Sequence, residues 1–293
     1  MILITVLRAG YARSADDGSY RADGTIALVR QYPPSTSSSS SSSALPTPLL
    51  TLLVDTGSPY DGPALLDTMA SLGVSPRDVD VVVCTHGHVD HVGNLNLFSQ
   101  SGRTIFYLGS DKLIPRDAYE SIEFQDGMSI PRPSRLKDEE LNEKDDLNIE
   151  GKSMLILPTY ERMAERDSYD HLILLKTPGH TESDLSVVAV GEDVRLNCVD
   201  CASVRSSESN KNLACSTCGA ILAANSHDYR LKSSIVVVAG DLFEDENDDE
   251  DDGAAWKGNS WNTEIQSLNR GLVRRIADVI VPGHGRPFKA GRK

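Results

Sequence analysis

The stretch from Thr85 to His91, T-H-G-H-V-D-H, places three histidines and one aspartate within six consecutive positions, directly after an apolar run. The whole chain has only seven histidines. Side chains so close in sequence point in different directions and cannot all converge on one ion, whereas a metal needs three or four converging ligands. A chain that uses this motif for metal binding must therefore fold so that distant segments complete the site.

Several apolar segments that we predict to be strands end in short corners rich in Gly, Asp or His. The order of strand, helix (63–72) and strand (79–84) predicts an α/β layered domain. If the strands lie side by side, the corners gather at one edge, which is where sites are built. The further corners are 55–57, 177–180, 240–241 and 282–285.

These corners supply ligands that can complete two metal sites. An isolated histidine can be an ordinary surface or core residue without any metal. That explanation fits poorly for five histidines and two aspartates that follow strands. Two adjacent ions can hold a hydroxide as nucleophile, and we predict catalytic roles for Asp90 and Asp241. The predicted ligands are His86, His88 and His180 on the first ion, Asp90, His91 and His284 on the second, and Asp241 as a bridge.

Four of the five cysteines fall in a short region that has the Cys-x-x-Cys spacing of a zinc ribbon. We predict a structural zinc ion held by Cys198, Cys201, Cys215 and Cys218. The alternative is four ordinary thiols in a loop.

Charge and composition limit the partners and compartments that the chain can have. The net charge is −14, and an acidic run predicts a solvated loop over 244–259, so no global basic surface is available for nucleic acid. No apolar segment is long enough for a membrane helix, and the short apolar start predicts a strand instead of a signal peptide. We therefore expect the cytosol, with the nucleus as a second compartment. We also expect a Ser/Pro-rich loop over 31–48, mostly loop over 111–152, and an insertion over 192–232.

The arrangement of the motif 86–91 with the corners 177–180, 240–241 and 282–284 resembles the metallo-β-lactamase superfamily. The resemblance implies an αββα four-layer sandwich over a single domain, 1–293, with two sheets packed face to face. It also implies two zinc ions at the active site, although iron and manganese suit the same ligands. In that fold the Asp-Thr-Gly segment, here 55–57, supports the metal site without ligating it.

A narrower resemblance is to the metallo-β-lactamase domain-containing protein 1 family, through the segments 21–25, 85–98, 177–188 and 236–244. That family has been assigned endoribonuclease activity on histone pre-mRNA 3′ ends, which implies an RNA substrate. One alternative is a thioester hydrolase like glyoxalase II, which shares all seven ligands but carries a helical domain after the last one. Another is a non-catalytic, metal-holding interaction module. The sequence is compatible with a homodimer.

Overall fold

The computed structural model describes residues 1–33, 46–115, 118–126, 129–130, 147–148, 153–157, 170–199, 231–248 and 254–291. One large sheet of fourteen strands dominates these residues. Its first part contains, in spatial order, β1 (Ile2–Arg8), β4 (Ile26–Gln31), β5 (Leu50–Val54), β6 (Val81–Cys84), β7 (Ile105–Leu108), β8 (Asp111–Ile114) and β9 (Ala118–Ser121).

The second part of the sheet comes mainly from the C-terminal half of the chain. It contains, in spatial order, β10 (Gln125–Asp126), β13 (Ser153–Ile156), β14 (His171–Lys176), β15 (Leu185–Cys198), β16 (Leu231–Gly240), β17 (Val279–Pro282) and β18 (Phe288–Lys289). Two small sheets lie apart from it: the hairpin of β2 (Tyr11–Ser14) and β3 (Tyr20–Asp23), and the pair of β11 (Ser129–Ile130) and β12 (Leu147–Asn148).

The long strand β15 joins the two parts of the sheet. Its first half pairs antiparallel with β14, and its second half pairs parallel with β1, from Val194 opposite Ile2 to Cys198 opposite Val6. Its pairing with β16 shifts register between Val190 and Val194. The expectation of two sheets packed face to face is therefore corrected in one respect, because hydrogen bonds run continuously from one part to the other.

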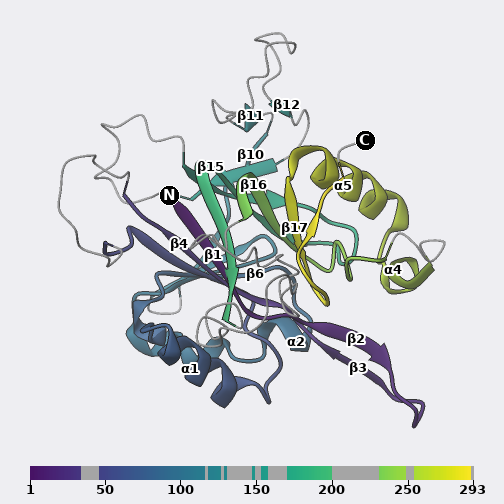
Figure 1. Ribbon diagram of the computed structural model, residues 1–293, viewed down its shortest axis with the longest axis horizontal. Coiled ribbons are helices and arrows are strands. Elements are labelled where there is room, and N and C mark those ends of the chain that lie inside the picture. Colours follow the sequence, from purple (N-terminus) through teal and green to yellow (C-terminus); the bar gives the residue numbers. More distant parts are fainter. Residues whose placement is uncertain are drawn as a thin grey trace, which may run out of the picture.

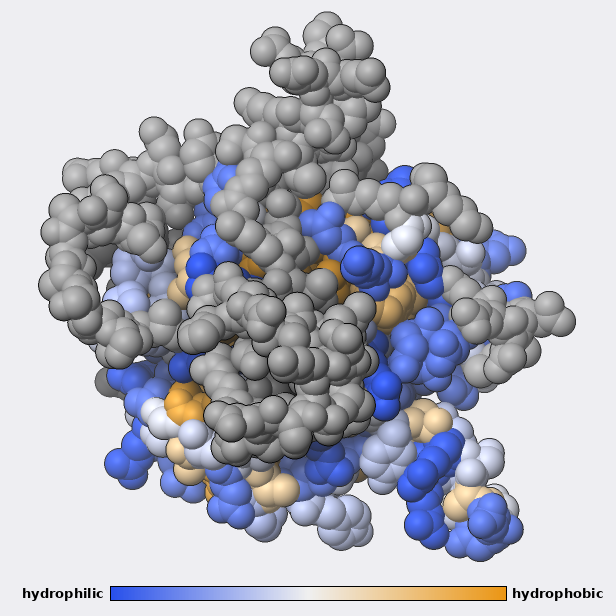
Figure 2. Space-filling model, in the orientation of Figure 1, coloured by the Kyte–Doolittle hydropathy of each residue, from blue (hydrophilic) through white to orange (hydrophobic). Residues whose placement is uncertain are grey.

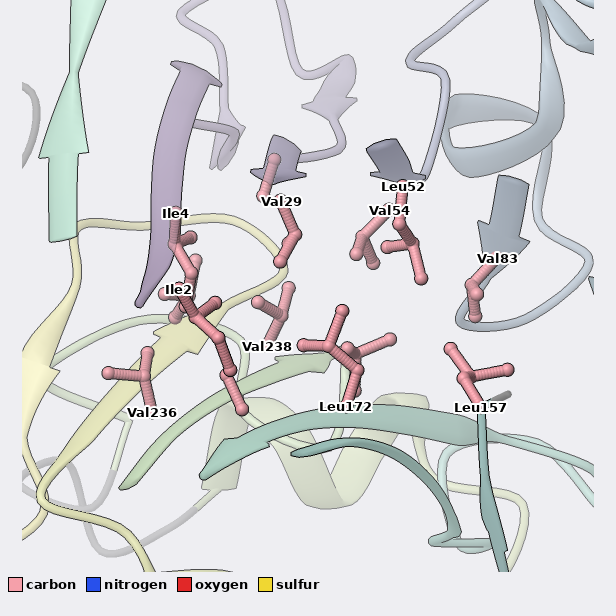
Figure 3. Packing of buried hydrophobic residues seen from close by; sticks show 14 of the residues in the cluster. Ile2, Ile4, Val29, Leu52, Val54, Val83, Leu157, Leu172, Val236 and Val238 are labelled. Atoms are coloured by element: carbon pink, nitrogen blue, oxygen red, sulfur yellow. The ribbon is translucent and has the colours of Figure 1, made fainter. Parts of the chain in front are cut away.

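Four layers nevertheless result, because the two parts of the sheet face each other across an apolar core (Figure 3). Side chains of β1 and β4 to β6 meet side chains of β14 to β17 there. A second apolar cluster lies between β16, β17 and α5 (Thr263–Ile276), and a third between β4 to β6 and α1 (Gly62–Ser71). Figure 1 shows the two helices on opposite sides of the sheets, so the predicted helix–sheet–sheet–helix order is confirmed.

Helix α1 begins and ends within one residue of the predicted helix 63–72. Helix α1 has proline in its first turn, where the ring removes no helical hydrogen bond. It ends before Gly73, which adopts a φ of +68° that favours glycine. In α5 the side chain of Asn262 accepts hydrogen bonds from the amides of Glu264 and Ile265 and so caps the first turn. The shorter helices are α2 (Val89–Val92), α4 (Ala254–Asn259), η1 (Pro76–Asp78), η2 (Leu95–Leu97) and η3 (Ser99–Ser101).

Three predicted loops contain regular structure. The region 111–152, for which the sequence predicts mostly loop, contributes β8 to β12. The residues of β8 and β9, DKLI and AYES, are exposed or half-buried and do not alternate between polar and apolar, so they lack the pattern that marks a strand in sequence. The expected insertion 192–232 begins and ends in strands, because β15 continues to Cys198 and β16 begins at Leu231, and its residues 200–230 lie outside the described part of the chain.

The prediction of a solvated loop over the acidic region 244–259 is also wrong. The region contains helix α4, and Glu244 and Asp248 are buried. Asp248 is buried because its carboxylate is paired with Arg270 of α5, a partner that lies far along the sequence. Burial of a charge is tolerated when such a partner satisfies it.

Some sequence predictions fall outside the described residues. These are the central part of the serine-rich loop, 34–45, and three of the four predicted zinc ligands, Cys201, Cys215 and Cys218. Cys198 is described, and it is buried at the end of β15. Among the described residues, no helix has both the length and the apolar character needed to cross a membrane.

Candidate metal centre

The structure brings all seven predicted ligands to one edge of the sheets. Five of them lie in turns that follow strands, as the sequence predicts, whereas Asp90 and His91 lie on helix α2. They form two groups in which the ligand atoms lie within 4.8 Å of one another. The groups are His86, His88, His180 and Asp241, and then Asp90, His91 and His284.

The first group places three imidazole nitrogens around one point. Nδ1 of His88 lies 2.9 Å from Nε2 of His86 and 3.1 Å from Nε2 of His180. The Oδ2 atom of Asp241 lies 3.6 Å from Nε2 of His86 and 3.4 Å from Nε2 of His180. Three imidazoles and one carboxylate oxygen are a donor set that suits zinc.

The second group lies on the other side of the Asp241 carboxylate. Nε2 of His91 is 3.2 Å from Oδ1 of Asp241, and Nε2 of His284 is 3.1 Å from its Oδ2. The Oδ2 atom of Asp90 lies 3.9 Å from Nε2 of His91 and 3.8 Å from Nε2 of His284. One carboxylate therefore faces both groups, which is the arrangement needed for a bridging ligand.

Buried polar atoms in the centre lack hydrogen-bond partners among the described residues. They include Nε2 of His91 and Oδ1 of Asp241. Leaving such atoms unsatisfied is costly, and a cation between the two groups would satisfy them. Burial alone would raise the pKa of Asp241, but His91 and His86 outweigh it and hold that pKa well below its usual value. The carboxylate is therefore ionised, as a metal ligand must be.

Asp55 orients His91 and is not itself in either ligand group, as the resemblance implies. Its Oδ2 lies 2.8 Å from Nδ1 of His91, and its two oxygens accept hydrogen bonds from the amide and hydroxyl of Thr85 at 2.7 and 2.9 Å. The first contact leaves Nε2 of His91 turned toward Asp241. Asp55 has a φ of +59°, the only positive φ of a non-glycine residue among those the structure describes. Such strain persists where surrounding contacts hold it, commonly at functional sites.

A backbone carbonyl orients the last ligand, and the sequence gives no signal for it. Nδ1 of His284 lies 3.1 Å from the carbonyl oxygen of Asp23, at the end of β3. The amide of Thr25 donates to the carbonyl of Gly283 at 2.7 Å, which joins the same two segments. A side chain at Gly283 would collide with Asp241, because a Cβ atom there would lie 1.9 Å from Oδ1. Only glycine leaves room for the bridging carboxylate.

Glu244 is a further residue of the centre, and the sequence does not predict it. Its Oε2 lies 3.9 Å from Nε2 of His284, and its Oε1 accepts a hydrogen bond from Asn259 at 3.2 Å. Burial, followed by repulsion from Asp241, raises the pKa of Glu244 to about 7. The only signal for it in the sequence is its position three residues after Asp241, which the acidic run around it obscures.

Replacing Asp55 tests whether it orients the ligands. We expect Asp55→Asn to weaken binding of one of the two metal ions by about 10- to 100-fold, which is typical of losing a partner that orients a metal ligand. Competition with a chromophoric chelator measures this without an activity assay. Asp67→Asn makes the same chemical change on the exposed face of α1 and should leave both affinities unchanged. Equal affinities in the two variants would contradict the role of Asp55.

Comparison of the sequence with known proteins identifies its superfamily. A sequence profile described as the metallo-beta-lactamase superfamily matches residues 50–194, and the chain belongs to this superfamily. It is similar to metallo-beta-lactamase domain-containing protein 1 of Xenopus laevis, with 29% identity over 98% of this chain and 81% of that protein. The protein of the same name from Homo sapiens is 28% identical over 99% of this chain and 83% of its own length. The superfamily and the histidine–aspartate cluster together indicate a metal-dependent hydrolase.

Proposed function

We propose that this chain is a binuclear zinc-dependent hydrolase that cleaves phosphodiester bonds in RNA. The observation that carries the proposal is the pair of ligand groups on either side of Asp241. The choice of RNA rests on the resemblance of 85–98 and 236–244 to a family with endoribonuclease activity. We further propose that the protein acts in the cytosol, with the nucleus as a second compartment.

The donor set matches what two divalent ions require. When bound, such ions lower the pKa of water toward about 7 and stabilise charge on the group under attack. Five imidazoles and two carboxylates suit zinc. The chain's own contribution is to fix these donors before substrate arrives, through Asp55 behind His91 and the carbonyl of Asp23 behind His284.

Of the two carboxylates among the predicted ligands, Asp90 is the better placed to handle a proton. About 20% of its side chain is exposed, whereas the side chains of His91 and His284 beside it are almost fully buried. An exposed carboxylate oxygen at the opening of the centre can orient an attacking water and accept its proton. Asp241 cannot do this from the inside, because only 4% of its side chain is exposed.

Assays of the purified protein test the proposal. We expect elemental analysis to find two zinc ions per chain in the centre, and we expect the zinc-loaded protein to cleave single-stranded RNA. Removal of metal with a chelator should abolish cleavage, and added zinc should restore it. S-lactoylglutathione is the control substrate for a thioester hydrolase. Hydrolysis of that thioester with RNA left intact would replace the proposed activity, and metal binding without either activity would favour an interaction module.

A further inference from the structure

A cleft of about 720 Å³ lies beside the metal centre and has no role in the chemistry described so far. It is lined by the β2–β3 hairpin, by the loop 58–61 and by the start of α2, including Asp90. Figure 1 shows this hairpin projecting from the body of the molecule close to α2. A substrate that reaches Asp90 can therefore extend into the cleft.

Exposed apolar side chains gather in this cleft. Among the described residues, eight large hydrophobic side chains are exposed, and four of them line it: Tyr11, Tyr20, Tyr60 and Val89. Tyr60 is 93% exposed and Tyr20 is 61% exposed. In Figure 2 the visible surface of the hairpin mixes hydrophilic and pale apolar residues. Exposed aromatic rings gathered beside the candidate metal centre indicate a binding surface.

Another exposed aromatic residue lies at the first ligand group. The amide of Trp261 donates to the carbonyl of His180 at 3.0 Å, and the side chain is 54% exposed. Exposed aromatic residues therefore neighbour both ligand groups, with Tyr60 and Tyr20 in the cleft that contains Asp90 and Trp261 directly beside His180. Such an arrangement can contact a substrate that extends on either side of the reacting bond.

The hairpin also carries two arginines directly opposite each other. Arg13 on β2 pairs with Arg21 on β3, and both are exposed. Like charges at directly opposed positions destabilise a hairpin. Within the hairpin, Arg21 has a salt bridge to Asp17 at 3.2 Å, whereas the guanidinium of Arg13 lies over the ring of Tyr11 at 5.2 Å. Of the two, Arg21 lines the cleft, where its guanidinium can contact a phosphate.

We propose that this cleft binds single-stranded RNA, with bases stacked on Tyr60 and Tyr20 and a backbone phosphate on Arg21. This inference rests on the proposed function for its substrate. Aromatic rings interleaved with basic residues form the usual surface for single strands, since every base offers a face for stacking. A duplex keeps its bases stacked on each other, so it offers none to the tyrosines.

Stacking also explains how a chain with a net charge of −14 could bind a polyanion. Only one phosphate is neutralised in this arrangement, so binding depends weakly on salt. For single strands, the slope of log K against log salt is about −0.7 for each phosphate contact. The contact at Arg21 predicts a slope of about −0.7, and Arg21→Gln should bring it close to zero.

Equilibrium binding tests the cleft separately from catalysis. The probe is a fluorescein-labelled, phosphorothioate single-stranded RNA of about 12 nucleotides, and its anisotropy is followed on titration with the zinc-loaded protein. We expect Tyr60→Ala and Tyr20→Ala each to weaken binding by about 10-fold, the size of one lost base stack. Tyr60→Phe retains the ring and should bind within about twofold of the wild type.

Two controls complete the design. Tyr119→Ala removes a tyrosine that is 74% exposed on β9 and does not line the cleft, so it should bind RNA like the wild type. The probe in duplex form should bind at least about 10-fold more weakly than the single strand.

The outcomes separate the cleft from the reaction. Unchanged affinity in both alanine variants, or equal affinity for duplex and single strand, would overturn the cleft assignment even if the protein cleaves RNA. Tyrosine-dependent binding without any RNA cleavage would uphold the cleft and reject the proposed reaction. These two failures give different results in the binding and cleavage assays, so neither can be mistaken for the other.

Discussion

Asp241→Ala is expected to abolish hydrolysis and to reduce the metal content from two ions per chain to at most one. Asp241 is the only one of the seven ligands that faces both groups, with Oδ1 toward His91 and Oδ2 toward His86 and His180. Losing a partner that merely orients a ligand costs up to about 100-fold in affinity or activity. Loss of a ligand shared by two ions should exceed that. Elemental analysis and initial rates measure the two effects independently.

A second substitution guards against simple misfolding. Asp241→Asn keeps the size of the side chain but cannot bridge two cations as a charged carboxylate, so it should also lose activity. Asp245→Asn, four residues further along, provides the matched control with both metals and activity retained. Circular dichroism checks that each variant is folded. If Asp241→Asn kept two ions and full activity, the binuclear centre would have to be abandoned.

Arg270→Met is expected to destabilise the fold strongly. We expect it to lower the free energy of unfolding by about 3–5 kcal/mol, as for other broken buried ion pairs. Nη1 and Nη2 of Arg270 donate to the two oxygens of Asp248 at 2.7 and 2.6 Å, and Nη1 also donates to the carbonyl of Leu242 at 2.8 Å. The guanidinium carbon lies 4.3 Å from the ring centre of Phe243 and 4.6 Å from that of Trp256. Without the arginine, the Asp248 carboxylate stays buried but has lost its partner charge.

Urea denaturation of the metal-free protein measures this loss. Arg275→Met removes an exposed arginine from the same helix and should change the unfolding free energy by less than about 0.5 kcal/mol. The double variant Arg270→Met with Asp248→Leu should recover part of the loss, because it removes the unpaired charge as well. A loss below about 1 kcal/mol in Arg270→Met would mean that this ion pair does not stabilise the fold as the burial of both partners indicates.

The sequence predicts well which residues meet at the centre, because most of them lie shortly after a strand. Strands that end in Gly, Asp or His can be recognised one at a time, and the edge where they meet follows from packing them side by side. The residue pattern alone is therefore enough to group His180 and His284 with His86 and Asp90. The positions of helices α1 and α5 are equally accessible, from proline and glycine near α1 and from apolar spacing in α5.

What the sequence does not predict depends on distant partners or on the backbone. The carbonyl of Asp23 behind His284 has no residue signature, since any residue offers a carbonyl. The burial of Asp248 follows from Arg270, and their pairing cannot be read from the acidic run. Strands β8 and β9 carry polar side chains, so their place in the sheet comes from backbone pairing with β7 and with each other.

The pairing of β1 with the far half of β15 has a consequence for synthesis on the ribosome. Ile2 to Val6 have their partners at Val194 to Cys198, which are made much later in the chain. At about 5–20 residues per second, roughly 10–40 s pass before those partners exist. For that time one edge of β1 is open, and open strand edges invite pairing with other chains. Strand β1 can therefore join the sheet fully only after β15 has been made, and the candidate metal centre is complete only after His284, which lies further along the chain.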